Sequence, residues 1–266
     1  MPVQVQSFFH RDSNTFSYLV SDPASGEAAL IDPVLDYDPD TDASSESPVQ
    51  PALHAIEQQG LRLRWLLETH AHADHVSAGR RLKQRFPHAT LAIGEGIRAV
   101  QATFAPRFGL QLPAADDIFD HLFADGETFT LGEVRGQVIA VPGHTSDSIA
   151  YLIGDALFTG DSLFMPDGGT ARCDFPGGDA AQLYRSIQRL LALPESTRVF
   201  VCHDYGPGGR DIANETTIGE QRARNIHVHD GVAEADFVSV RQARDATLAE
   251  PALMQPAVKA NIQGGA

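Results

Sequence analysis

The chain contains one dense group of metal-type side chains, in the stretch His70-Ala71-His72-Ala73-Asp74-His75. Imidazole and carboxylate groups are ligands that zinc, iron and manganese all accept. In an extended segment, residues two apart point to the same side, so His70 and His72 can face one point. Asp74 and His75 lie beyond the turn and can reach another side of that point, or a second metal beside it. The stretch therefore predicts a metal centre.

The alternative is a surface histidine tract without a ligand role. The position of the stretch argues against this, because residues 61–69 form an apolar run typical of a buried strand and residues 80–85 are predicted to be helical. Chemistry in an α/β protein is concentrated at such strand ends. Three further ligand-type residues also follow apolar strands: His144, Asp161 and His203. As a set they predict one site, in which Asp161 either bridges two metals or completes a single one.

The elements that must position these residues are those of an α/β chain. Strands are predicted at residues 3–9, 15–20, 27–32, 90–94, 127–131, 137–141, 148–153, 156–159 and 198–202. Helices are predicted at residues 50–60, 96–104 and 180–191. Residues 35–50 are acidic and rich in serine and proline, which predicts a solvated loop. We expect one domain over residues 1–266, with a polar, helical C-terminal segment from about residue 216.

Composition limits the classes of function. The chain has 266 residues, of which 42% are hydrophobic, and a net charge of −15, which disfavours nucleic acid or an anionic membrane as a partner. Two cysteines, Cys173 and Cys202, do not make a disulfide framework. The sequence shows neither a secretory leader nor a membrane-spanning run. We therefore expect a cytoplasmic protein with a small-molecule substrate; a homodimer surface is one alternative role for the C-terminal segment.

The motifs resemble the metallo-β-lactamase superfamily in type and order, over residues 3 to 205. They are His70-x-His72-x-Asp74-His75, Gly143-His144, Gly160-Asp161 and His203. The resemblance implies an αββα four-layer sandwich with the metal site at the edge of the two sheets. In members with two metals, one would be held by His70, His72 and His144 and the other by Asp74, His75 and His203, with Asp161 as the bridge.

A narrower resemblance is to the persulfide dioxygenases, sulfur dioxygenases related to glyoxalase II. It is carried by residues 69–75, residues 158–161, Arg172-Cys173-Asp174-Phe175 and His203-Asp204-Tyr205. It implies one Fe(II) held by His70, His144 and Asp161, a two-histidine, one-carboxylate triad suited to O2 chemistry. It also implies that O2 oxidises glutathione persulfide to sulfite and glutathione. His72, Asp74, His75 and His203 would then support the ligands, unless they hold a second metal.

The residues that would contact the substrate are less sharply indicated. Arg172 is the candidate for holding a glutathione carboxylate, with an ion pair to Asp174 as the structural alternative. Tyr205 is a candidate for substrate contact and catalysis, with simple packing as the alternative, and the adjacent Asp204 is a further catalytic candidate. Cys173 follows the arginine here, whereas mitochondrial-type members carry glycine-cysteine-glycine before it.

The alternative function is a glyoxalase II-like thioester hydrolase with two metals, either zinc or a mixed pair. The ligand set permits this activity. Its glutathione-binding basic cluster is not evident here, since only Arg222, Arg224 and Lys259 are available in the C-terminal region. A binding module without turnover is disfavoured, because it has no need of seven convergent metal-type residues.

Overall fold

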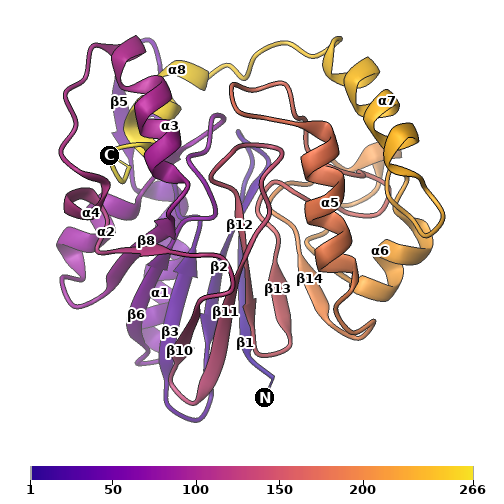
Figure 1. The fold of residues 1–266 in the computed structure, drawn as a ribbon. Coiled ribbons are helices and arrows are strands. Elements are labelled where there is room, and N and C mark those ends of the chain that lie inside the picture. The colour runs from indigo at the N-terminus through magenta and orange to yellow at the C-terminus, as the bar shows by residue number, and fades with distance from the viewer. Residues whose placement is uncertain (1, 266) are drawn as a thin grey trace.

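Two six-stranded sheets form the centre of the protein, and helices cover their outer faces (Figure 1). The computed structural model describes residues 2–265. The first sheet has the order β1-β2-β3-β6-β8-β9 and the second β10-β11-β12-β13-β14-β15. The strands of the first sheet are β1 (Gln4–His10), β2 (Thr15–Ser21), β3 (Glu27–Ile31), β6 (Arg62–Leu67), β8 (Thr90–Gly94) and β9 (His121–Phe123). Those of the second are β10 (Thr128–Leu131), β11 (Val134–Ala140), β12 (Ile149–Ile153), β13 (Ala156–Phe158), β14 (Arg198–Phe200) and β15 (Glu215–Thr217).

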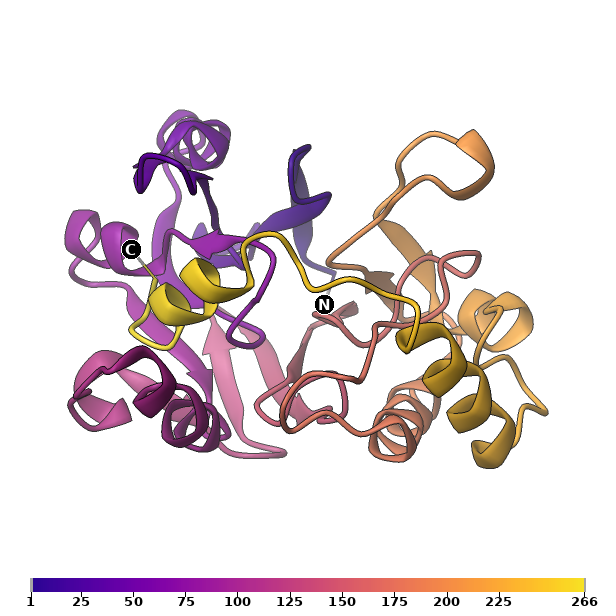
Figure 2. The ribbon, with the colours of Figure 1, turned by 90° about the horizontal axis from the view of Figure 1, so that it is seen from above.

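The helices divide between the two outer faces. On the first sheet lie α1 (Gln50–Gln58), α2 (Gly79–Arg85), α3 (Ile97–Phe104) and the short α4 (Ala115–Ile118). On the second lie α5 (Ala180–Leu191), α6 (Ile218–Arg224) and α7 (Glu234–Asp245). The last helix, α8 (Met254–Asn261), returns to the side of the first sheet, and Figure 2 shows the connector from α7 passing over the middle of the molecule to reach it. The predicted αββα sandwich is confirmed.

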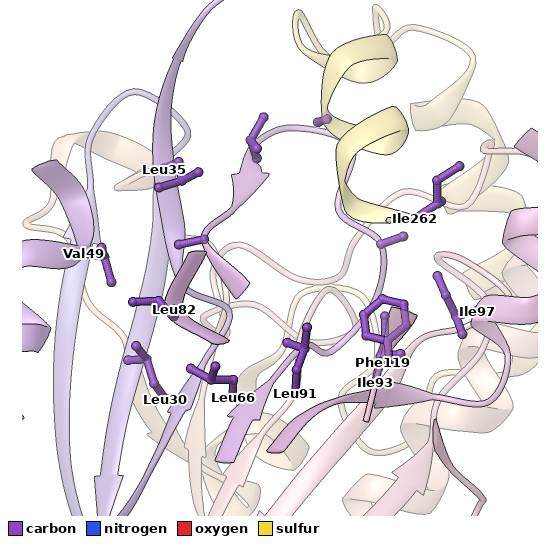
Figure 3. Close-up of a cluster of buried hydrophobic side chains, with 14 of the residues drawn as sticks. Leu30, Leu35, Val49, Leu66, Leu82, Leu91, Ile93, Ile97, Phe119 and Ile262 are labelled. Atoms are coloured by element: carbon purple, nitrogen blue, oxygen red, sulfur yellow. The ribbon is translucent and has the colours of Figure 1, made fainter. Parts of the chain in front are cut away.

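Three hydrophobic clusters hold the layers together. Between the sheets, Tyr18 and Ile31 of the first sheet pack with Tyr151 and Phe158 of the second, all fully buried. A second cluster lies under α5 to α7. The third lies between the first sheet and its helices, and Figure 3 shows its residues, among them Leu30, Leu66, Leu82, Leu91, Ile97 and Ile262. Burial of each such side chain stabilises the fold by about 1.5–3 kcal/mol, so the layers are fixed by apolar packing and their edges are left for polar residues.

One sequence-based expectation about local structure was wrong. Within residues 35–50, predicted to be a solvated loop, lies a hairpin of β4 (Val34–Asp38) and β5 (Ala43–Ser45), followed by a 3-10 turn at Ser47–Val49. The acidic residues stabilise its turn, since Thr41 Oγ1 donates to Asp38 and Tyr37 Oη donates to Asp42. Strand β4 also pairs with β7 (Val76–Ser77), directly after the histidine stretch.

The C-terminal segment contains α6, α7 and α8, and α8 is not wholly polar. Its residues Ala257 and Val258, and Ile262 beyond it, are buried in the outer cluster of the first sheet. Among residues 2–265, the helices are all too short or too polar to cross a membrane.

Candidate metal centre

Four strands, one from the first sheet and three from the second, deliver the predicted ligands to one place in the sandwich. The loops after β6, β11, β13 and β14 carry His70 to His75, His144, Asp161 and His203 respectively. Strands β13 and β14 are parallel, and β11 shares their direction because β12 pairs antiparallel with both β11 and β13. The seven ligand-type residues predicted from the sequence therefore converge.

One group of possible ligands joins both sheets. His70, His144 and Asp161 can each offer one ligand atom, with all three atoms within 4.8 Å of one another. The distance to Asp161 Oδ2 is 3.5 Å from His144 Nε2 and 4.0 Å from His70 Nε2. All three residues are buried. Two imidazoles and one carboxylate in this arrangement can hold a single metal and leave further coordination positions open.

The other ligand-type residues lie beside this group. His72, Asp74 and His75 form a second set that could hold a metal. His203 Nε2 lies 3.2 Å from Asp161 Oδ1 and 3.5 Å from Asp74 Oδ2, so it stands between the two groups. A two-metal arrangement with Asp161 in the middle is therefore also compatible with the geometry.

Unpaired buried nitrogens indicate that these groups fit a metal. His70 Nε2, His72 Nδ1 and His75 Nε2 have no hydrogen-bond partner among residues 2–265, although an unpaired buried polar atom is costly. The opposite nitrogens of two rings are fixed by backbone carbonyls: His144 Nδ1 donates to Arg172 O at 2.7 Å and His203 Nδ1 to Asn14 O at 3.1 Å. Such contacts fix the tautomer that presents Nε2 to a metal.

The electrostatics separate the histidines. Burial and the nearby charge of His72 hold the pKa of His70 well below its usual value, so His70 offers a free lone pair. Burial also lowers the pKa of His72 and of His203, but neighbouring carboxylates outweigh it. Asp32, 3.1 Å from His72 Nε2, raises the pKa of His72 to about 9, and Asp161 with Asp74 raises that of His203 to about 10.

Three polar residues from distant parts of the chain brace the histidine loop. Asp32, at the end of β3 with a left-handed φ of 46°, accepts from both Thr69 N and Thr69 Oγ1. Asp147 Oδ2 accepts from Ala71 N at 2.9 Å. Asn261, the last residue of α8, donates to the carbonyls of His72 and His75 and accepts from Ser77 N. The backbone on both sides of the ligands is thus fixed before a metal binds.

Glycines allow the other loops to approach closely. Gly143, next to His144, has a φ of +141°, and a Cβ there would lie 2.3 Å from Leu183 N. Gly160, next to Asp161, has a φ of +50°, and a Cβ there would lie 2.8 Å from Thr69. Both positions therefore require glycine for backbone conformation and for space.

A cavity of about 430 Å³ opens onto the metal-type residues. His144, Asp161, His203 and Asp74 form its inner wall. Its outer wall comes from Phe164, Phe175, Arg172, Tyr205, the α7 residues Arg241 and Arg244, and the connector residues Leu248, Ala249 and Pro251. The cavity is apolar with a few cationic groups, which suits an extended organic anion.

The predicted substrate residues reach this cavity unequally. Arg172 lines it, but its guanidinium also pairs with Asp174 at 2.6 Å and donates to Ala249 O at 2.7 Å, which is the structural alternative foreseen for it. Tyr205 stands at the rim with 61% of its surface exposed, its ring parallel to that of His203. Asp204 does not line the cavity; its carboxylate faces Arg210 and accepts from Ala213 N.

Several residues of the site were not found by sequence reasoning. Cys202 offers a sulfur near His72, Asp161 and His203 and was considered only for disulfides. Burial and the charge of Asp161 raise the pKa of Cys202 well above its usual value, so it remains a neutral thiol beside the metal group. Two other residues, Thr15 and Asn261, have side chains that are not typical metal ligands. Thr15 contacts Asp74, His75 and His203, and Asn261 contacts the backbone of His75. Only the folded chain brings them to the site.

Comparisons with known proteins agree with this geometry. Residues 10–203 match the model of the metallo-beta-lactamase superfamily. A probable metallo-hydrolase of Burkholderia pseudomallei is 45% identical, over 98% of this chain and 92% of its own length. The mitochondrial persulfide dioxygenase ETHE1 of Homo sapiens is 30% identical, over 99% of this chain and 89% of its own.

A solved structure gives the same result for the fold. ETHE1 from Myxococcus xanthus superposes with a TM-score of 0.80 at 32% identity, covering 99% of this chain and all of that one. This coverage takes in α7 and the connector that line the cavity. The αββα sandwich, the ligand set at its edge and these relatives lead to one assignment: the chain belongs to the metallo-beta-lactamase superfamily.

Proposed function

We propose that this protein is an iron-dependent persulfide dioxygenase that oxidises glutathione persulfide with O2 to sulfite and glutathione. The observation that carries the proposal is the group of His70, His144 and Asp161, of which His144 and Asp161 line a largely apolar cavity. Iron(II) held by such a triad supplies O2 activation together with open positions for a sulfur ligand. The likeness to persulfide dioxygenases over nearly the whole chain supports the same choice.

The remaining metal-type histidines each face a carboxylate. His72 faces Asp32, and His203 and His75 both face Asp74. In the proposed enzyme these pairs hold the rings and keep the region beside the iron neutral, so that a single metal is bound. Asp161 keeps its charge, because His203 holds its pKa well below the usual value although burial acts in the opposite direction.

The cavity wall supplies the proposed substrate contacts. Arg172 has five N–H donors, of which three are used by Asp174 and Ala249 O, so two remain for a glutathione carboxylate. Tyr205 is proposed to contact the persulfide end, since it stands beside His203 at the rim. We assign Asp204 a positioning role, because its ion pair with Arg210 fixes the loop that carries Tyr205.

A metal count combined with an oxygen electrode tests the proposal. The iron-loaded protein should contain one iron per chain, consume O2 with glutathione persulfide and release sulfite. His144→Ala should lose both the iron and the activity, whereas the exposed His88→Ala should keep both. Two metals per chain, no O2 uptake and cleavage of a glutathione thioester would instead establish the hydrolase.

The second candidate function, a glyoxalase II-like hydrolase, is favoured by His72, Asp74 and His75, which also form a metal-sized group. His75→Ala separates the two candidates. A one-iron enzyme keeps its iron in this variant, because His75 lies outside the triad. A two-metal enzyme loses one of its two metals.

A further inference from the structure

A second cavity adjoins the first at the connector that leads to α8. Its volume is about 540 Å³, and it shares Asp74 and Pro251 with the first cavity. It is lined by the end of β1 and by the β4–β5 hairpin, including His10, Ser13 and Asp36. The proposed reaction makes no use of it.

A continuous row of hydrogen-bonding groups joins this second cavity to the metal-type residues. Asp36 Oδ1 lies 3.0 Å from His10 Nε2, and His10 Nδ1 lies 2.7 Å from Ser13 Oγ. Ser13 Oγ is 2.7 Å from Thr15 Oγ1. Thr15 is fully buried, and its Oγ1 lies 3.4 Å from Asp74 Oδ2. The same oxygen lies 3.4 Å from His75 Nδ1 and 3.3 Å from His203 Nδ1.

The groups in this row are of the kind that passes protons. A hydroxyl can donate and accept at once, and an imidazole can accept at one nitrogen while it donates from the other. His10 is the last ring before the second cavity, with 13% of its side chain exposed, and Asp36 beside it is 42% exposed. The other ionisable groups around the same cavity are Asp12, Asp38, Tyr37, Asp74 and His75.

The proposed reaction must dispose of protons. In the balance RSSH + O2 + H2O → RSH + SO3²⁻ + 2 H⁺, the persulfide S–S bond breaks and the two sulfur atoms together lose four electrons, which reduce O2. Two protons are left for each turnover. A substrate in the first cavity would occupy the space between the metal-type residues and solvent on that side, whereas the second cavity would remain free.

We propose that Thr15, Ser13 and His10 relay these protons from the metal centre into the second cavity. The inference rests on the proposed function, because it needs a reaction that releases protons at this centre. Asp36 holds the His10 ring in the orientation that the row requires.

Steady-state kinetics in dilute and in imidazole-containing buffer test the relay. His10→Ala should lower kcat about tenfold or more in dilute buffer, since an assisted proton transfer is worth at least that factor. Its solvent isotope effect on kcat should rise, while the KM for the persulfide and the iron content stay unchanged. Free imidazole, which fits the vacated site, should restore kcat. Ser13→Ala should show the same fall, without rescue by imidazole, because the break then lies inside the row.

Two controls guard against a merely structural effect. Ser45→Ala removes another hydroxyl from the same cavity, one that bonds to Ser47 and lies outside the row, and should leave kcat unchanged. His10→Gln keeps a polar side chain of similar reach but cannot pass a proton, so it should match His10→Ala in dilute buffer. Unchanged kcat in His10→Ala, or a loss that imidazole does not restore, would overturn the relay.

Failure of the relay can be told apart from failure of the proposed function. The function is judged on the wild-type protein, by O2 uptake with glutathione persulfide. If the wild-type protein instead cleaves a glutathione thioester, that reaction, RC(O)SR′ + H2O → RCOO⁻ + R′SH + H⁺, also releases a proton. The same variants then test the relay on the hydrolysis.

Discussion

The side chain of Asn261 should decide how firmly the histidine loop is held. It is 4% exposed and makes three hydrogen bonds to that loop. The side-chain amide donates to His75 O at 2.8 Å and to His72 O at 2.9 Å, and its oxygen accepts from Ser77 N at 2.9 Å. The partners lie more than 180 residues away in sequence, so these bonds tie the end of α8 to the histidine loop.

The variant Asn261→Ala removes all three hydrogen bonds and leaves two buried carbonyls and one buried N–H unpaired. A hydrogen bond contributes about 1 kcal/mol net, and a buried group left unpaired costs about 1–3 kcal/mol. Allowing for some relaxation, the free energy of unfolding should fall by about 3–4 kcal/mol. The apolar contacts of Ala257, Val258 and Ile262 remain, so α8 should stay docked.

Urea unfolding of the metal-free protein measures this loss. The matched control is Gln263→Ala, an exposed amide two residues further on that donates only to Lys259 O, and its cost should stay below about 0.5 kcal/mol. Since the loop carries ligand-type residues, Asn261→Ala should also weaken metal binding about tenfold or more, measured by competition with a chelator. The bracing role would be refuted if the free energy of unfolding of Asn261→Ala lay within about 0.5 kcal/mol of that of the control and if the two variants bound metal equally well.

Two further predictions concern the loops around the site. Gly160→Ala should lower the free energy of unfolding by about 2–4 kcal/mol and reduce metal content, because the new Cβ adds a clash to a left-handed φ of +50°. The control Gly26→Ala, at a φ of +71° with nothing within 4 Å, should lower it by only about 1 kcal/mol. Equal losses in thermal unfolding would exclude the clash. Burial, then Arg241, lowers the pKa of His227 to about 4, and its Nδ1 accepts from Thr170 N. Because the unfolded chain binds the extra proton first, stability should fall as the pH drops from about 6.5 towards 4, by about 1 kcal/mol after allowance for partial exposure. His227→Gln should flatten this part of the pH–stability curve, and an unchanged slope would contradict the assignment.

The convergence of the candidate ligands could be predicted because the sequence pattern marks where strands end. Each apolar run stops at a glycine, a histidine or an aspartate, and parallel strands bring their carboxyl ends to a common edge. His70, His144, Asp161 and His203 therefore followed from sequence pattern, and the four-layer fold followed from the resemblance of their motifs. Which of them bind metal, and how many metals, does not follow from spacing, because one carboxylate can serve either arrangement.

The residues that hold the ligands could not be predicted in the same way. Asn261 and Thr15 are ordinary polar residues in sequence, and their role depends on contacts across 186 and 188 positions. The β4–β5 hairpin was hidden for a related reason. Its acidic residues are typical of a solvated loop, whereas β4 also pairs, through Val34 and Ser77, with the strand that directly follows the histidine stretch. Long-range pairing of this kind overrides local composition.

The number of metals should depend on pH, and the charges show in which direction. A second metal held by His72, Asp74 and His75 would have to take His72 from Asp32, and the raised pKa of that ring, about 9, leaves it protonated at neutral pH. If His203 also served as a ligand, its pKa of about 10 would oppose the metal in the same way. Metal ligands must be deprotonated, so binding at this second set releases protons and strengthens as the pH rises towards 9. His70, with its lowered pKa, is ready to bind at pH 7. Titration with iron(II) without oxygen should therefore show one tight site at pH 7 and a second, weaker one that tightens at pH 9; two equally tight sites at pH 7 would mean that the ion pairs do not oppose a second metal.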